Sequence, residues 1–562
     1  FDGFVKGSGS TFAVNSGLAG ADLKVSGVSA SSNISLVSAG GLLISGDVSN
    51  SAGTAVLTAG NSGSAAVNLS GGADVNVVGN LTVNSGVVSL GAGSVLTTTT
   101  GDVFLQSNFA GNALNLSLAA GAQINAAAAT GDIFFNPSAA GAITVTGGAA
   151  AGLLNAGNTV SLRGGAVDVN VNQINGRVVS NGATITTSTV TTAAGDLSLG
   201  GYTSSGATSF TANGAGADII VNGALSNGVG GLTLQAGAGA DSDVRINSAV
   251  TSSGLLNINS GTGAGSDITI AASQLAQGAT VNANSASLNL GTNAGLRANT
   301  GALNIQSNSG GTLNVTLASG AFLRSTSSNV NFNSAGSPGA ITMTGGLGSV
   351  QAGGATPQVV FNGGSSAVDV NVSSIVGSAG GTGSTFSLVT QSGDLRVGPV
   401  TSTGTTLLQA AGNGADLITT GAVDAGAGNL TLATGTGTNA DIRLNNNVTT
   451  TGTLLVNTGT GAGSDLAVAS AVTVSDGATT ITTPTMSVAN GATVRATAQD
   501  LQISGSASGG LLAVTLGGAN ATLASATGNV NFNSVANPGA VTISGGPASG
   551  VISANGGNGN IS

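Results

Sequence analysis

Aliphatic and polar residues alternate in short runs along this chain. Three such runs, each opened by Asp, are Asp218-Ile-Ile-Val-Asn222, Asp243-Val-Arg-Ile-Asn247 and Asp267-Ile-Thr-Ile270. A period of two places successive side chains on opposite faces of a β-strand. We therefore expect short strands whose alternate aliphatic residues point inward, separated by tight turns of Gly, Asn, Ser and Thr.

Helix is disfavoured throughout the sequence. The chain contains 96 glycines and no Glu, and β-branched residues are frequent at the apolar positions. Glycine and β-branched residues are poor helix formers, whereas β-branched residues fit the pleated surface of a sheet. The pattern predicts an all-β protein.

The strand-opening aspartates recur at nearly constant intervals. Neighbouring members of the first set are 22, 25 and 24 residues apart, and the second set repeats these gaps. A unit of about 24 residues is thus nested in a unit of about 200. The two sets are Asp196, Asp218, Asp243 and Asp267, and Asp394, Asp416, Asp441 and Asp465.

The long unit is marked by a phrase that closes each copy. GAITVTGG ends at Gly148, GAITMTGG ends at Gly346 and GAVTISGG ends at Gly546. These phrases divide the chain into an incomplete first copy over 1–147, a second over 148–346, a third over 347–546 and the start of a fourth over 547–562. We infer that both ends are cut from a longer protein.

The first copy is shorter than the third by one short unit. The tetrapeptide GSTF begins at Gly9 and again at Gly383, 138 and 162 residues before the closing glycine pair. A solenoid can lose one coil and restack on its neighbours, so the short unit is interpreted as a coil. We predict a right-handed parallel β-helix of roughly 23 coils, forming one continuous rod over 1–562.

Composition supports a packed interior. Hydrophobic residues make up 41% of the chain, which contains no Trp and one Tyr. Such a content indicates a folded chain rather than a disordered one. Three phenylalanines, Phe134, Phe332 and Phe532, recur in the long unit, and we predict that they stack in the core.

The sequence offers little catalytic chemistry. It lacks His, Cys and Glu, so it has no imidazole base, no thiolate and none of the usual zinc ligand sets. Sixteen of the 20 aspartates directly precede an aliphatic residue, which indicates a repeated structural role, such as accepting N–H bonds at a strand start. We expect no enzymatic activity, no catalytic residue and no cofactor.

Stacked carboxylates about 5 Å apart repel by about 1 kcal/mol per pair even in water. Backbone donors at the turns, Arg245 and Arg443 beside the ladders, or Ca²⁺ between coils could offset that repulsion. Calcium is the less favoured hypothesis, because the tandem nonapeptide of calcium-binding β-rolls is missing. Its candidate ligands are Asp196, Asp218, Asp243, Asp267, Asp394, Asp416, Asp441 and Asp465.

The net charge and the absence of Cys indicate which partners and which cellular location to expect. The net charge is −10 and the ten basic residues are scattered, so no nucleic-acid footprint is present. No run of 18 apolar residues occurs, so no segment is expected to span a bilayer as a helix. The absence of Cys favours export of the chain in an unfolded state.

Two tandem phrases, GGLTLQAGAG over 230–239 and GNLTLATGTG over 428–437, lie in this Cys-free, Gly/Ala/Asn/Thr-rich chain. In this respect the chain resembles the filamentous haemagglutinin-like exoproteins of Gram-negative bacteria. The resemblance implies two-partner secretion through an outer-membrane transporter, and adhesion to host cells, sister cells or matrix polysaccharide. The coil is somewhat longer than is usual in that family, and no N-terminal secretion domain is included. No functional residue carries over.

Two functions are therefore expected from different classes. The first is the shaft of a secreted cell-surface adhesin of a Gram-negative bacterium, which mediates cell–cell or cell–surface attachment and biofilm formation. The alternative is a self-associating subunit of an extracellular filament or sheath, because an uncovered parallel edge is a template for strand pairing.

Overall fold

The computed structural model consists of parallel β-strands joined by turns. It describes residues 5–62, 64–109, 111–148, 151–182, 184–506, 510–533, 538–545, 550–554 and 560–562. These residues form 63 strands, from β1 (Val5–Gly9) to β63 (Val551–Ala554), and no helix. Among them, consequently, no helix is long and apolar enough to cross a membrane.

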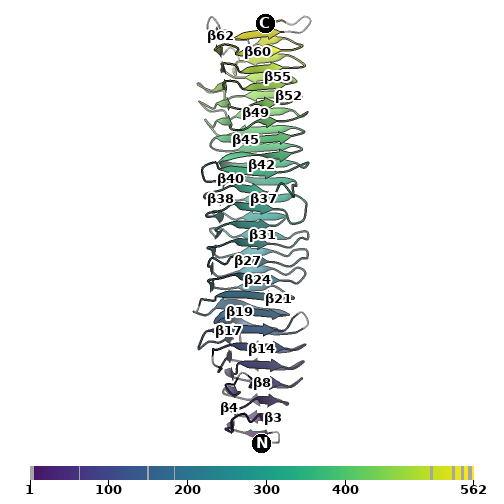
Figure 1. Ribbon diagram of the computed structural model, residues 1–562, viewed down its shortest axis with the longest axis vertical. Helices are drawn as coiled ribbons and strands as arrows, with labels where there is room; N and C mark the ends of the chain where they lie inside the picture. Colours follow the sequence, from purple (N-terminus) through teal and green to yellow (C-terminus); the bar gives the residue numbers. More distant parts are fainter. Residues whose placement is uncertain are drawn as a thin grey trace. The chain divides into compact units, whose positions relative to one another are not determined.

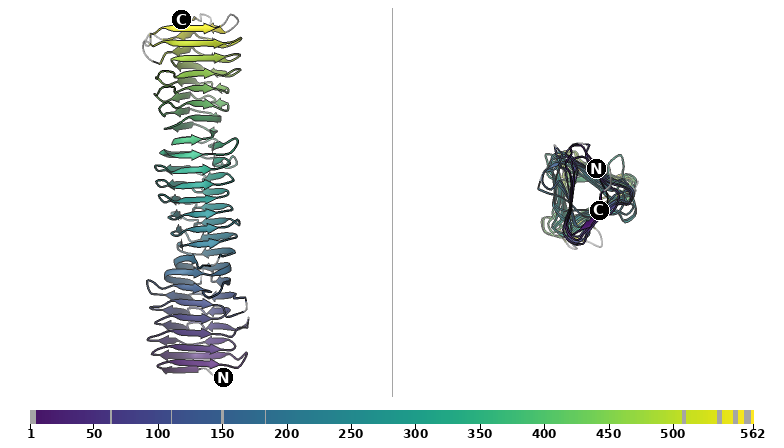
Figure 2. Two further views of the ribbon diagram at one scale, coloured as in Figure 1. Left: turned by 90° about the vertical axis from the view of Figure 1, so that its left-hand side faces the viewer. Right: turned by 90° about the horizontal axis from the view of Figure 1, so that it is seen from below.

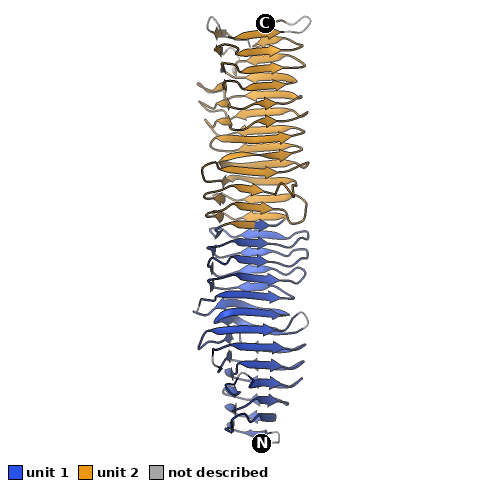
Figure 3. Ribbon diagram, in the orientation of Figure 1, with its two compact units in different colours: residues 1–279, 283–285 blue, residues 280–282, 286–562 orange. Residues whose placement is uncertain are grey.

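The chain divides into two compact units, coloured separately in Figure 3. Unit 1 comprises residues 1–279 with 283–285, and unit 2 comprises residues 280–282 with 286–562. Each unit is a parallel β-solenoid, which confirms the predicted fold class. One continuous rod and the right-handed sense of the coil stay predictions. Of the expected fourth copy, only 550–554 and 560–562 lie within the described residues.

A regular coil has three strands, and each strand pairs with the strand three places later. In unit 1, β10 (Leu81–Asn84), β11 (Val87–Leu90) and β12 (Val95–Thr98) pair in this way. Their partners are β13 (Val103–Gln106), β14 (Leu114–Leu118) and β15 (Gln123–Ala126). Within each unit the strand arrows of Figure 1 stack accordingly, and Figure 2 shows the same stacked strands from the side.

Coil length averages about 24 residues but varies along the chain. The offset between paired residues is 30 where Val103 meets Ile133 and 18 where Ala379 meets Val397. The number of coils is about 21, slightly below the roughly 23 expected from dividing the whole chain by 24.

The interior follows the alternation seen in the sequence. On β25 (Ile219–Val221) and β28 (Val244–Ile246), residues Ile219 and Val244 are paired and fully buried. Ile220 and Arg245 lie on the outer face, also paired with each other. Because each buried residue packs on its equivalent one coil away, small branched side chains fill a narrow interior.

One predicted core residue is wrong. Phe134 on β16 (Ile133–Phe135) lies on the outer face, where its ring stacks on Phe104 with centroids 5.0 Å apart. Phe135 is the buried residue, because the register of the Ile133-Phe134-Phe135 run selects the second phenylalanine. Phe332 is fully buried as predicted and stacks on Phe361, with centroids 4.9 Å apart. Phe532 is only half-buried.

The two units fill the same core position differently. In unit 1, the Tyr202 hydroxyl and Ser188 Oγ are 2.6 Å apart, and both residues are buried. In unit 2, Val400 corresponds to Tyr202, because it lies six residues after Asp394. Phe386, which pairs with Val368, corresponds to Ser188. Each pair thus combines a large residue with a small one, which conserves volume.

The long unit does not contain a whole number of coils. In unit 2, β36 (Leu303–Gln306) and β58 (Leu501–Ser504) carry equivalent sequences but belong to different ladders. The strand that follows β36 is β37 (Leu313–Leu317). When the strand pairings are followed from β37, one coil at a time, β58 is reached after eight coils. The repeat is therefore eight coils plus one strand, so equivalent residues of successive copies lie on different sides of the coil.

The buried Tyr202 hydroxyl provides a test of the core. Replacing Ser188 by Ala removes its hydrogen-bond partner, at a cost of about 1–3 kcal/mol. Amides of β23 (Tyr202–Ser204) should then exchange about 5- to 150-fold faster in hydrogen–deuterium exchange. The double variant S188A/Y202F, which removes both hydroxyls, should recover most of the protection. Equal losses in the single and double variants would contradict this account.

Candidate functional site: the aspartate ladders

The predicted aspartates lie at the same corner of successive coils. In unit 1 they open β22 (Leu197–Leu199), β25, β28 and β31 (Asp267–Ile270). In unit 2 they open β45 (Leu395–Ser402), β47 (Leu417–Thr419), β50 (Ile442–Leu444) and β53 (Asp465–Val468). The structure thus brings each set of four together as a ladder along the coil axis.

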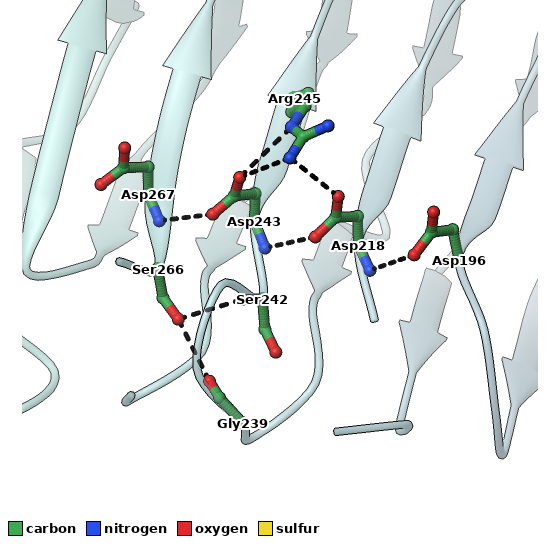
Figure 4. A network of polar contacts seen from close by, with 8 residues as sticks. All are labelled: Asp196, Asp218, Gly239, Ser242, Asp243, Arg245, Ser266 and Asp267. Atoms are coloured by element: carbon green, nitrogen blue, oxygen red, sulfur yellow. Dashed lines mark hydrogen bonds and ion pairs between the residues drawn. The ribbon is translucent and has the colours of Figure 1, made fainter. Parts of the chain in front are cut away.

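Within each ladder, the first three carboxylates each accept a backbone N–H from the next coil (Figure 4). Oδ1 of Asp196 accepts from the amide of Asp218 at 3.0 Å. Asp218 accepts from Asp243 at 2.8 Å, and Asp243 from Asp267 at 2.9 Å. Asp394, Asp416 and Asp441 do the same in unit 2, at 2.9 to 3.0 Å. The predicted role as an acceptor at a strand start is confirmed.

One arginine in each ladder bridges two carboxylates. Arg245 Nη2 lies 3.1 Å from Asp218 Oδ2 and 2.8 Å from Asp243 Oδ2 (Figure 4). Arg443 Nη2 lies 3.2 Å from Asp416 Oδ2 and 3.0 Å from Asp441 Oδ2. In each ladder the two oxygens turned away from the backbone donors therefore share one guanidinium, which offsets their mutual repulsion.

The carboxylates that an arginine bridges are largely withdrawn from water. The side chains of Asp218 and Asp243 are 8% and 14% exposed, whereas Arg245 is 48% exposed. Burial raises the pKa of Asp218, while the amide of Asp243 and the charge of Arg245 lower it. Burial also raises the pKa of Asp465, and the neighbouring charge of Asp441 adds to that increase.

A second cap, which the sequence analysis missed, lies beside each ladder. Ser266 Oγ accepts the amide of Ser242 at 3.1 Å and donates to the carbonyl of Gly239 at 3.2 Å (Figure 4). Ser464 Oγ makes the equivalent bonds to Ala440 and Gly437 in unit 2. In the sequence, this cap is marked by a Ser that directly precedes the last Asp of each ladder.

Asparagine takes the same capping position in other coils. Asn33 Oδ1 accepts the amide of Thr54 at 2.9 Å, and Asn80 Oδ1 accepts that of Asp102 at 3.0 Å. In unit 2, at another corner of the coil, Asn429 Oδ1 accepts the amide of Thr453 at 3.0 Å. Because a neutral amide serves here as well as a carboxylate, the essential property is the acceptor oxygen and not the charge.

The calcium hypothesis finds no support in this geometry. Calcium requires six to eight oxygen ligands, and most of the eight candidate aspartates direct Oδ1 at an amide. Within the described parts of the chain, no group of three or more acidic side chains could hold a metal ion. The ladders are suited to holding coil against coil.

Two shallow surface hollows lie outside the ladders. One, of about 270 Å³, is lined in unit 2 by Gln358, Ser378, Gly380, Gly398 and Pro399, among others. The other, of about 240 Å³, lies in unit 1 and is lined by hydroxyl, glycine and aliphatic residues. Neither lining includes an ionisable side chain, so neither hollow brings together an acid and a base.

Substitutions of Asp218 separate capping from charge. D218N keeps an acceptor oxygen and should change the free energy of local opening by less than about 1 kcal/mol. D218A leaves the part-buried amide of Asp243 without its partner and should cost about 1–3 kcal/mol. Hydrogen exchange of β28 amides measures both, with and without calcium. Equal damage in both variants, or protection by calcium, would favour a charge-based or metal-binding role.

The arginine bridge has a matched control two coils away on the same face. Arg443→Ala should destabilise the surrounding coils by about 0.5–1 kcal/mol, because the bridge is half-exposed, and added salt should reduce the difference from wild type. Arg396→Ala removes an exposed arginine of the same unit, for which no ion pair with a described residue is found, and should be neutral. Local hydrogen exchange distinguishes the two; equal effects would refute the bridging role.

Comparison with protein-family models, curated proteins and solved structures found no match to this chain. The coils themselves establish a parallel β-solenoid, which is compatible with a β-helix repeat protein. The likeness to filamentous haemagglutinin-like exoproteins therefore depends on the sequence phrases and on the repeated coil alone.

Proposed function

We propose that this chain is part of the shaft of a secreted bacterial cell-surface adhesin. The observation that carries the proposal is the use of the polar side chains. In both units, Asp, Asn, Ser and Arg residues are engaged in hydrogen bonds and ion pairs between one coil and the next. Such side chains stabilise the stacking of one coil on the next, as suits a spacer.

Repetition favours the same role. The two ladders preserve both the spacing of four aspartates and the position of the bridging arginine, in units that differ at core positions such as Tyr202 and Val400. A catalytic site would need one particular constellation, whereas a shaft needs the same contact many times. We propose that the chain has no enzymatic activity.

Export and location form part of this proposal. A chain without Cys cannot be cross-linked before or during passage through an outer-membrane transporter. With the resemblance to two-partner secretion exoproteins, this favours the surface of a Gram-negative cell. The proposed partners are a host or sister-cell surface or matrix polysaccharide, with attachment and biofilm formation as the outcome.

Deletion of the gene in the source organism, followed by complementation, tests the proposal. We expect the deletion to reduce cell aggregation and surface attachment. Complementation with a chain lacking 243–440 should restore them, because this deletion joins Ser242 to Asp441, the equivalent of Asp243, and preserves the local stacking. Protease treatment of intact cells, followed by immunoblotting, reports whether the chain is at the surface.

Each outcome decides between the alternatives. Loss of attachment with rescue by the shortened chain supports a shaft. Loss without rescue, although the shortened chain reaches the surface, assigns binding to the removed segment and overturns the spacer role. Unchanged attachment with loss of extracellular filaments supports the self-associating filament instead.

A further inference from the structure

The inner corner of many coils carries a hydroxyl residue. In unit 2, Ser325 Oγ donates to the carbonyl of Gly301 at 2.9 Å, and Ser525 Oγ donates to that of Gln499 at 2.8 Å. Thr450 Oγ1 likewise donates to the carbonyl of Gly428. All three hydroxyl residues are at most 5% exposed. A neutral O–H group thus satisfies a backbone acceptor inside the turn.

Asp476 occupies such a corner, on the ladder that also holds Thr450, Ala496 and Ser525. It ends β54 (Thr473–Asp476) between Thr450 on the preceding coil and Ala496 on the following one. Its side chain is 1% exposed. Oδ1 accepts a hydrogen bond from the Thr479 hydroxyl, whereas Oδ2 is buried without a hydrogen-bond partner.

No described charged group faces this carboxyl. On the following strand, β57 (Thr493–Ala496), Arg495 is exposed on the outer face, paired with Ser475. The preceding strand, β51 (Val448–Thr449), and the adjoining Thr450 present only uncharged side chains. On β55 (Ala478–Thr482) the nearest polar group is the Thr479 hydroxyl. Asp500, at the start of the next strand, is exposed and accepts the amide of Asn529.

Burial without a compensating charge disfavours the ionised form. It raises the pKa of Asp476 to about 7, although the Thr479 hydrogen bond lowers it. A neutral carboxyl leaves one buried oxygen unpaired, which costs far less than an unpaired buried anion. The coil itself does not require an acid here, because Gly278 occupies the corresponding buried strand end of β32 (Leu275–Gly278).

We propose that the coil around Asp476 is a proton-dependent element, closed when the carboxyl is protonated and prone to local opening when it ionises. The element comprises β54, β55 and β57, which contact one another or lie in the same coil. It would make one position of unit 2 respond to pH near neutrality, in a chain that contains no His. This inference does not depend on the proposed adhesive function.

The direction of the pH effect follows from proton linkage. The folded state holds the proton more tightly than the unfolded chain, whose Asp has a pKa near 3.8. The stabilising contribution is therefore complete below about pH 4 and is lost as the pH rises through about 7. With one proton involved, the opening equilibrium should increase by at most about tenfold per pH unit in this window.

Hydrogen–deuterium exchange of the full chain between pH 5 and 8.5, corrected for the intrinsic rate, tests this inference. In the wild type, protection of the β54, β55 and β57 amides should decrease as the pH rises and level off above about pH 8. The variant D476N, which cannot ionise, should show flat protection. Asp424→Asn, an exposed aspartate of the same unit that accepts the amide of Gly426, is the matched control and should behave like wild type.

A second variant keeps the inference testable if D476N does not fold. D476S places at this corner the hydroxyl residue found in other coils and should also give flat protection. A pH-dependent loss in wild type that both D476N and D476S abolish supports the proposal. Parallel profiles in wild type and D476S, or protection that increases with pH in wild type, would overturn it.

Discussion

Every other feature of this structure depends on the pairing of each strand with its equivalent in the next coil. In a parallel solenoid the backbone bonds run along the coil axis, so a residue contacts the residue about 24 positions away more closely than most of its neighbours in sequence. No coil buries its own interior, and each becomes stable when the next covers it. The repeat is the physical consequence of that requirement.

Stacking brings similar residues together, which is favourable for some side chains and costly for others. Aliphatic residues and phenylalanines gain contact, as with Phe332 and Phe361. Asparagines bond to one another: Asn304 Nδ2 donates to Asn282 and Asn331 Nδ2 to Asn304. Carboxylates repel, and here the repulsion is offset by backbone N–H groups and a shared arginine.

The same constraint limits what the outward side chains can do. A side chain that bonds to the next coil is committed to structure, as the bridged carboxylates and arginines of the ladders are. Because the long unit is eight coils plus one strand, an outward feature that recurs once per copy within unit 2 returns on another side of the coil. A spacer tolerates that change of side, whereas a flat binding face that extends over several copies would not.

The sequence by itself determined the strand type, the coil of about 24 residues and the capping position of the aspartates. It could do so because alternation and spacing are local, periodic properties that stacking preserves. Tertiary structure decided which of two adjacent phenylalanines is buried, that Ser188 and Tyr202 share a hydrogen bond, and that Asp476 points inward. These outcomes depend on register and on contacts between coils, and register is set by the cumulative length of all the turns before it. A periodic sequence fixes the spacing of its coils, but not which side chain each coil turns toward its neighbour.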